Sequence, residues 1–175
     1  RAMHESVPAA PAIRPTGWAD LAEVLEIYAR ARAYMCAHGN AAQWRGGHPA
    51  RALVERDIEE GTGFVLEAGG RIEGAFALVG GDDPTYARIE GGAWRSDTPY
   101  CTIHRLASAG RIHGVLRACV GWSAGRCAHL RTDTHANNAP MLHLLPALGF
   151  VRCGIIYVAD GTPRIAFERL PGEGA

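Results

Sequence analysis

The sequence HRLASAGRIHG, residues 104–114, has the pattern of a strand that ends in a glycine-containing loop just before a helix. Apolar and β-forming residues occupy 100–107, and the stretch 108–114, with Gly110 and Gly114, interrupts them. Apolar side chains then recur on one helical face at Val115, Leu116, Cys119 and Val120. The free N–H groups of a helix N-terminus and the glycines of such a loop can bind an anion. The loop has neither the G-K-[ST] of a P-loop nor a complete G-x-G-x-x-G, so a turn beside a solvated basic face is the alternative interpretation.

The charge pattern around this loop favours the anion site. Eighteen basic and eighteen acidic side chains give a net charge of zero, yet residues 98–132 contain no Asp or Glu. That stretch holds five arginines and three histidines: Arg105, Arg111, Arg117, Arg126 and Arg131, with His104, His113 and His129. Guanidinium groups pair well with phosphate oxygens, so the segment suits a phosphorylated ligand. The zero net charge argues against a general nucleic-acid or membrane-surface binder.

Length and composition indicate one globular domain. The chain has 175 residues, of which 47% are hydrophobic and 21% are charged. Every basic residue is arginine, which excludes a lysine Schiff base. The 5 cysteines include no C-x-x-C pair, so we expect no disulfide framework and a reducing, cytoplasmic location. No run approaches the ~18 apolar residues that span a bilayer. We interpret residues 1–11 as a flexible leader and residues 12–171 as the domain.

The spacing of apolar and turn-forming residues predicts a mixed α/β arrangement. Strands are expected at 13–15, 64–68, 72–79, 100–107, 130–134, 150–159 and 163–170, and helices at 21–35, 50–60, 115–126 and 138–148. Two hairpins are expected to turn at Gly69-Gly70 and at Asp160-Gly161. Residues 80–99 are rich in Gly, Asp and Pro and read as a long loop that holds one short strand at most.

Several segments together resemble the GNAT N-acetyltransferases. They are HRLASAGRIHG with its following helix, LRTDTHANNAPM at 130–141, LGF at 148–150 and CGIIYVADGTPRIAFE at 153–168. Upstream, GNAAQW at 39–44, DDPTY at 82–86 and EGGAW at 90–94 look like one subfamily of small GNAT proteins of unknown substrate. The resemblance covers about residues 13–170. It implies a single-domain GNAT fold with a mixed, mostly antiparallel sheet of six or seven strands, about four flanking helices, and acetyl-CoA as co-substrate.

The resemblance also implies which residues contact the cofactor. In GNAT proteins a central strand offers backbone groups to the pantetheine arm, and these positions map to Leu106, Ala107 and Ser108. The following loop, written R/Q-x-x-G-x-G/A, wraps the pyrophosphate and maps to Gly110, Arg111, Ile112, His113, Gly114 and Val115. Asn138 maps to a hydrogen-bond partner of the pantetheine. Two positions depart from the family pattern: Leu116 replaces a small residue, and Leu145 stands where a tyrosine often protonates the departing thiolate.

Acetyl transfer to an amine needs a base, because an ammonium group has no lone pair. His104 ranks first, since it lies just before the cofactor loop and histidine is a residue type suited to proton transfer at neutral pH; a packed strand histidine is the alternative. Asp133 and His135 end the next strand, beside the gap where the acceptor should enter, and helix capping is their alternative role. Tyr157 could protonate the thiolate, or it is simply a half-buried strand residue. A backbone N–H near Leu106 would stabilise the oxyanion.

Acceptor-binding residues are expected in the loops. Gln43 and Trp44 lie between the first two expected helices, a loop that often borders the acceptor pocket in GNAT folds. Tyr86 is a further candidate, although core packing is favoured for it. The histidines and cysteines have no metal-ligand spacing, so no metal is expected.

These observations favour an acetyl-CoA-dependent N-acetyltransferase that acts on the amine of a small molecule or peptide. Neither nucleic acid nor membrane is expected as a partner, and the chain is expected to be a monomer or homodimer. Leu116 and Leu145 motivate an alternative, a GNAT-fold sensor that binds CoA or acyl-CoA with little turnover. An unrelated α/β nucleotide binder is the third interpretation.

Overall fold

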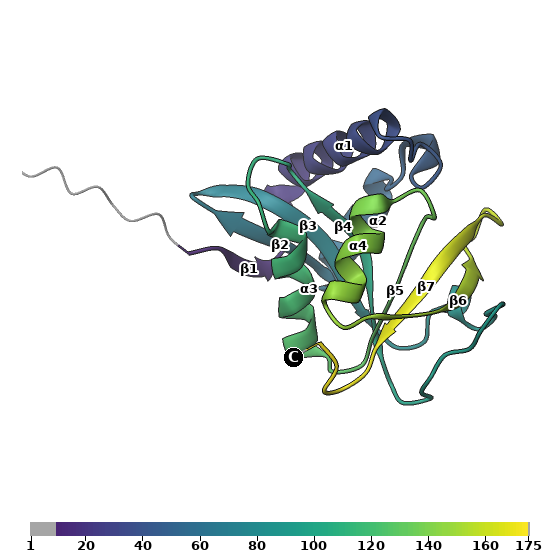
Figure 1. Cartoon of the computed structure of the whole chain (residues 1–175). Coiled ribbons are helices and arrows are strands. Elements are labelled where there is room, and N and C mark those ends of the chain that lie inside the picture. The colour runs from purple at the N-terminus through teal and green to yellow at the C-terminus, as the bar shows by residue number, and fades with distance from the viewer. Residues whose placement is uncertain (1–9, 175) are drawn as a thin grey trace, which may run out of the picture.

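The computed structural model describes residues 10–174, and these form one α/β domain around a mixed sheet (Figure 1). The sheet has 7 strands in the order β1-β2-β3-β4-β5-β7-β6. The strands are β1 (Ala12–Pro15), β2 (Gly63–Ala68), β3 (Arg71–Gly80), β4 (Cys101–Ser108), β5 (Leu130–Thr134), β6 (Val151–Tyr157) and β7 (Pro163–Arg169). The helices are α1 (Leu21–Ala37), α2 (Arg51–Glu60), α3 (Val115–Arg126) and α4 (Ala139–Ala147), with short 3₁₀ turns η1 (Trp18–Asp20), η2 (Arg45–Gly47) and η3 (Pro84–Tyr86). The predicted fold class is confirmed, while most of the predicted leader, residues 1–9, lies outside the described residues.

Helices cover both faces of the sheet, and the alternation of side chains along the strands explains why. In β2, Phe64 and Leu66 pack with α3 and α4, whereas Val65 packs with α1 and α2. Successive strand side chains point to opposite faces, so a strand buried on both sides reads as a continuous apolar run. The first core cluster contains Val120 and Leu145, and the second contains Ile27. This two-sided core holds β3 and β4 rigidly at the centre of the domain.

The two central parallel strands pair briefly and then separate. Within the described residues, β4 and β5 pair at Cys101–Leu130 and Thr102–Arg131 alone, while β5 pairs along its whole length with β7. On its other side β4 carries a bulge, because His104 lies opposite Ala77 whereas Ala107 lies opposite Ala75. The second half of β4 therefore has an edge that no strand covers.

The bulge in β4 is held from the second helix. Arg105 has a φ of 53°, in the left-handed region that non-glycine residues rarely adopt. Its guanidinium group donates to both carboxylate oxygens of Asp57 on α2, with the shortest contact at 2.7 Å. Both side chains are nearly buried. This ion pair fixes the point at which β4 turns away from β5.

The long loop between β3 and β4, residues 81–100, is anchored by a buried acid. Glu168 on β7 is 0% exposed and accepts hydrogen bonds from His129 at 2.8 Å, from Arg131 at 2.9 Å and from the backbone N–H of Arg95 at 2.8 Å. The Arg131 guanidinium lies 4.1 Å from the ring centroids of both Trp94 and Tyr100. The loop is therefore an ordered part of the domain.

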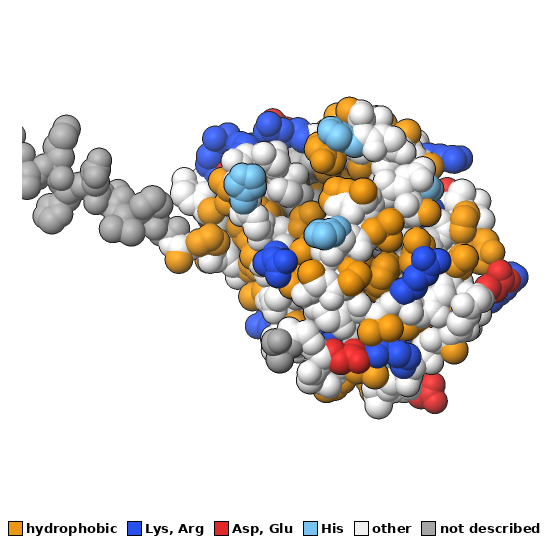
Figure 2. Space-filling model, in the orientation of Figure 1, with side chains coloured by type: hydrophobic (Ala, Val, Ile, Leu, Met, Phe, Trp, Pro, Cys, Tyr) orange, Lys and Arg blue, Asp and Glu red, His pale blue; other side chains and the backbone are white. Residues whose placement is uncertain are grey.

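The arginine-rich stretch is less basic in three dimensions than in sequence. Arg105 pairs with Asp57, Arg111 with Glu73 and Arg131 with Glu168. These acids come from other elements of the chain, which an acid-free window in the sequence does not reveal. Over α3 and α4 the surface shows apolar, Arg and His side chains, and acidic side chains lie mainly at the lower and right edges of the view (Figure 2).

One disulfide is present, although the sequence predicts no disulfide framework and a reducing compartment. Cys101 at the start of β4 and Cys127 just after α3 form a disulfide, with their Cα atoms 6.2 Å apart. They are 26 residues apart in sequence, so only the packing of α3 on β4 brings them together. Among the described residues, Cys36, Cys119 and Cys153 are free thiols. No helix within residues 10–174 is long and apolar enough to cross a membrane.

Candidate functional site

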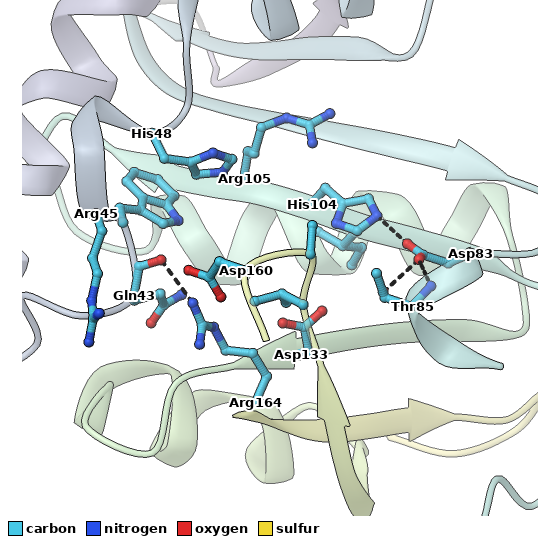
Figure 3. A pocket seen from close by; sticks show the side chains of 14 residues that line it. Gln43, Arg45, His48, Asp83, Thr85, His104, Arg105, Asp133, Asp160 and Arg164 are labelled. Atoms are coloured by element: carbon cyan, nitrogen blue, oxygen red, sulfur yellow. Dashed lines mark hydrogen bonds and ion pairs between the residues drawn. The ribbon is translucent and has the colours of Figure 1, made fainter. Parts of the chain in front are cut away.

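A cavity of about 450 Å³ opens where β4 and β5 separate (Figure 3). Its walls come from distant parts of the chain. Gln43 and Trp44 belong to the loop between α1 and α2, His104 to β4, Asp133 to β5 and Arg164 to β7. The volume and the mixed polar lining suit a small-molecule site.

His104 and Asp83 form a hydrogen-bonded pair on one wall. His104 Nε2 lies 2.8 Å from Asp83 Oδ2, and Thr85 donates to Asp83 Oδ1 through its backbone N–H at 2.9 Å and its hydroxyl at 2.6 Å. Burial favours a higher pKa for Asp83, but the hydrogen bonds from His104 and Thr85 outweigh it and hold the pKa at about 2. The ionised carboxylate therefore accepts from Nε2–H, and the lone pair of neutral His104 is on Nδ1.

Asp133 lines the same cavity and has a buried partner. Its Oδ2 accepts a hydrogen bond of 2.7 Å from the hydroxyl of Tyr86. Burial raises the pKa of Asp133, although the Tyr86 hydrogen bond opposes the shift. Tyr86 itself is 2% exposed and packs against Trp94 and Tyr100. Tyr86 thus lies behind Asp133, as the core-packing interpretation anticipates.

The loop between α1 and α2 reaches the end of β5 through one glutamine. Gln43 Oε1 accepts from Asn138 Nδ2 at 3.0 Å and from the backbone N–H of His135 at 3.3 Å. Trp44 is 8% exposed and contacts the ring of Tyr28 edge-on at 5.6 Å. Both residues line the cavity. Their expected role in acceptor binding stays a prediction.

The other proposed catalytic residues lie off the cavity lining. His135 Nδ1 accepts from the backbone N–H of Asn137 at 3.0 Å, and burial lowers the pKa of His135. The hydroxyl of Tyr157 donates to Glu90 at 2.8 Å on the exposed side of β6. Neither residue is among those that line the cavity. Leu145 is 0% exposed within the core, so its position offers no proton donor.

The loop after β4 exposes a series of backbone amides. Gly110 and Gly114 have φ of 78° and 80°, and they turn the chain so that residues 111–114 run along the surface. The amide of Ala109 donates to Glu73 O at 2.9 Å, and that of Gly110 to Ser108 Oγ at 3.1 Å. Within the described residues the amides of 111–114 have no acceptor, and no side chain caps α3. These free donors at a helix N-terminus form an anion-binding geometry.

The side chain of Arg111 supports this loop from below. Its Nη2 donates to Ile72 O at 2.8 Å, and its Nε lies 3.1 Å from Glu73 Oε2. Gly74 on β3 lets the start of α3 approach the sheet, since a Cβ there would lie 2.5 Å from a methyl group of Val115. The Arg111 side chain therefore holds the loop in place, while its backbone amide stays without an acceptor within the described residues.

The remaining predicted cofactor contacts lie along the uncovered edge of β4 and at the start of α4. Leu106 is part of the bulge and Ala107 and Ser108 follow it, where β4 has no partner on the β5 side. Asn138 caps α4, because its Oδ1 accepts from Met141 N at 3.3 Å while its Nδ2 donates to Gln43. Both polar groups of Asn138 thus have partners in the protein, and its pantetheine contact stays a prediction.

Solved structures with the same architecture show which fold the chain has. An acetyltransferase of the GNAT family from Streptococcus agalactiae is 27% identical, with a TM-score of 0.85 over 93% of this chain and 96% of that one. The protein has the GNAT acetyltransferase fold. A histone acetyltransferase HPA2-related protein from Corynebacterium glutamicum shares this GNAT fold with 24% identity, a TM-score of 0.62, and coverage of 94% of this chain and 98% of that one. No protein-family model and no curated protein matches the chain.

A third structure with the GNAT fold is a NatC complex bound to a Gag peptide and CoA. It is 13% identical and has a TM-score of 0.57, over 93% of this chain and 99% of that one, so it supports the GNAT fold alone. The Streptococcus agalactiae protein, the one of these three above 25% identity, supports acetyl transfer as the general reaction. Within residues 10–174 no group of three or more His, Cys, Asp or Glu side chains could hold a metal ion.

Two residues of the site escaped the sequence reasoning. Asp83 meets His104 across 21 residues, and Arg164 meets Gln43 across 121 residues. Asp83 caps the short turn η3 through Thr85 N, but a turn-forming sequence does not reveal a distant partner of the same carboxylate. Nothing in the local sequence around Arg164 distinguishes it from the other seventeen arginines.

Proposed function

We propose that the protein is an acetyl-CoA-dependent N-acetyltransferase that works by direct attack of an amine on the thioester. The observation that carries the proposal is the continuity of three features. Where β4 and β5 separate, three features follow one another: the free amides at 111–114, the uncovered edge of β4, and the cavity beside His104. This order matches a ligand with a diphosphate, an amide-containing arm and a reactive end.

The cofactor would be held mainly by backbone groups. The diphosphate would accept hydrogen bonds from the amides of the loop and the first turn of α3, where the helix dipole also favours negative charge. The pantetheine arm would pair with the edge of β4 as an added strand does. Arg117 is exposed on the first turn of α3 and could add a charge-assisted contact to a phosphate.

The acceptor would lose its proton to a residue of the cavity. His104 is the best-placed base, because Asp83 holds its Nε2–H and leaves the Nδ1 lone pair to take the proton, directly or through a water. Asp133 is the second candidate, since its raised pKa makes it a stronger base than an ordinary aspartate. As the new N–C bond forms, the C–S bond breaks and the thiolate takes a proton from solvent.

A backbone N–H at the bulge in β4 would stabilise the oxyanion. Arg105 and Leu106 stand opposite a single residue of β3, so a backbone N–H at this point can turn toward the thioester carbonyl. Positioning of the two reactants would contribute the larger part of the rate acceleration, because well-oriented reactants can lower the activation barrier by about 7–11 kcal/mol. A protein with no tyrosine at the Leu145 position can therefore still catalyse the transfer.

The proposed acceptor is the amine of a small molecule or peptide, and the proposed oligomeric state is a monomer or homodimer. The test is release of free thiol from acetyl-CoA with a broad panel of amines, alongside calorimetric titration with CoA. We expect CoA binding and amine-dependent release, and we expect His104→Ala to lower turnover while CoA affinity stays unchanged. His38→Ala, an exposed histidine on the far end of α1, is the matched control.

The sensor alternative predicts a different result from the same assay. The core position of Leu145 and the packing of Leu116 against the core favour it, because neither can serve the chemistry. CoA binding without thiol release on any amine would support the sensor and contradict the enzyme. Equal competition by plain adenine nucleotides and by CoA would contradict both, since the pantetheine edge would then contribute nothing.

A further inference from the structure

The cavity contains a buried arginine that no acidic group of the described residues pairs with. Arg164 on β7 is 6% exposed and lines the cavity. Its Nη1 donates to Thr162 Oγ1 at 3.0 Å and to Pro163 O at 2.9 Å, and its Nη2 donates to Gln43 O at 3.0 Å. No carboxylate oxygen within residues 10–174 lies within 4.0 Å of its guanidinium group. All three partners are neutral oxygen atoms.

Such an arrangement is unusual for a buried cation. A guanidinium group has five N–H donors, so three protein contacts leave two donors without an acceptor. Buried charges in proteins are normally paired, because desolvation of an ion is costly. Burial accordingly lowers the pKa of Arg164, and the positive charge of Arg45 lowers it further, while Asp133 and Asp160 oppose the shift at longer range.

The charges of the cavity are separated into two ends. Figure 3 shows Arg45 and Arg164 toward one side and His104 with Asp83 toward the other, with Asp133 on the lower wall between them. Arg45 is exposed on η2, and its side chain has no hydrogen-bond partner among the described residues. Asp160 is near Arg164 but accepts from Thr162 N at 2.9 Å and Thr162 Oγ1. One end of the cavity therefore holds the two arginines beside Asp160, whose Oδ1 already accepts from Thr162, and the other end holds Asp83 and His104.

We propose that the acceptor is an amine that also carries a carboxylate, with Arg164 binding the carboxylate and the amine lying toward His104. Free amino acids are the class that carries both groups on one small molecule. The proposal rests on the proposed acetyl transfer and adds the acceptor class. The planar fork of Arg164 is the geometry that carboxylates match in bidentate pairs, and Arg45 would add charge at the rim. An ammonium group would be attracted to Asp83 and Asp133 before its proton is removed.

The test compares matched acceptors. The twenty common L-amino acids are assayed with acetyl-CoA, each beside its amide and its decarboxylated amine. At least one free acid should be acetylated with kcat/KM at least about 100-fold above that of its two analogues, because a buried donor left without its partner discriminates strongly. Comparable rates for the decarboxylated amines would overturn the proposal while acetyl transfer itself stood.

Variants assign the effect to the two arginines. Arg164→Gln should raise KM for the free acid by at least about 30-fold and leave KM for acetyl-CoA and the rate with the amide within about threefold. Because Arg164 is buried and the variant could fold poorly, Arg45→Gln on the exposed rim is the second variant, with an expected rise in KM of several fold. Arg30→Gln, an exposed position on α1, removes the same charge and should change nothing.

A binding measurement separates this proposal from the failure of acetyl transfer. With CoA saturating, a free amino acid at millimolar concentration should raise the melting temperature of the wild type, and its amide should not. The rise should be smaller in Arg45→Gln. If thiol release fails on every amine but this shift is seen, the acceptor-site proposal stands and the enzyme proposal fails. If no free amino acid is acetylated and none shifts the melting temperature, the proposal is wrong.

Discussion

The hydroxyl of Tyr86 lies 2.7 Å from Oδ2 of Asp133, which joins the loop between β3 and β4 to the floor of the cavity. The same loop supplies Asp83, the partner of His104. Both candidate bases are therefore oriented by one segment, and that segment is fixed to the sheet through Glu168. The loop thus acts as a positioning element for the site.

The hydrogen bond from Tyr86 should hold down the pKa of Asp133. Because the bond lowers a pKa that burial raises, Tyr86→Phe should raise the pKa of Asp133 further. Loss of the bond should also reduce the free energy of unfolding by about 1–3 kcal/mol. An NMR titration of labelled aspartate carboxyl groups and urea denaturation measure the two effects. Tyr34→Phe, on the exposed face of α1, is the control, and an unchanged pKa of Asp133 would contradict the prediction.

CoA affinity should depend on the charge of the side chain at position 114 more than on its backbone conformation. Gly114 has a φ of 80°, and no atom lies within 4 Å of a Cβ built there. Gly114→Ala should therefore cost about 1 kcal/mol of stability while CoA binds within a few-fold of wild type. Gly114→Glu adds the same strain but puts a carboxylate beside the diphosphate, so CoA affinity should fall at least about 100-fold. Calorimetric titration of both variants checks this, and equal affinities would refute the phosphate-binding loop.

The Asp83–His104 pair should make the free energy of unfolding depend on pH in the acid range. Asp83 has a folded pKa of about 2 against an ordinary value of 3.8. A lowered pKa means that the unfolded state takes up the proton first, so the stabilisation is complete above pH 4 and disappears as the pH falls toward 2. This stabilisation is at most about 2 kcal/mol, and screening by solvent reduces it because the site is partly open.

Denaturation curves of Asp83→Asn between pH 6 and pH 2 measure this contribution. The wild type should be more stable than the variant at pH 6, and the two should converge near pH 2. Asp97→Asn removes the same charge from an exposed position of the same loop, and its stability should change with pH as that of the wild type does. A constant gap between wild type and Asp83→Asn at all pH values would show that the lost stability has another cause.

The Cys101–Cys127 disulfide should make stability depend on redox state. A cross-link over 26 residues removes conformational entropy from the unfolded chain, which is worth about 3–4 kcal/mol in the chain-entropy model. A reductant should lower the free energy of unfolding of the wild type by up to that amount and leave a Cys101→Ser/Cys127→Ser variant unchanged. Cys36→Ser, at an exposed free thiol, should respond as the wild type does. Titration of five reactive thiols in the unfolded, unreduced protein would contradict the pairing.

The sequence by itself determined the elements, their order and the turn at each glycine hairpin, because these follow from local periodicity and backbone preference. Gly69 and Gly70 have φ of 59° and 75°, as the predicted hairpin needs, and β5 occupies the predicted residues 130–134. The free amides of the loop before α3 were also foreseeable, since glycines and a helix start are local features. The tertiary structure alone decided which charges meet. Asp57, Glu73 and Glu168 neutralise arginines far away in sequence, Asp83 orients His104, and Arg164 stays without an acid. Electrostatic pairing depends on distance in space, and a window of sequence holds no record of that distance.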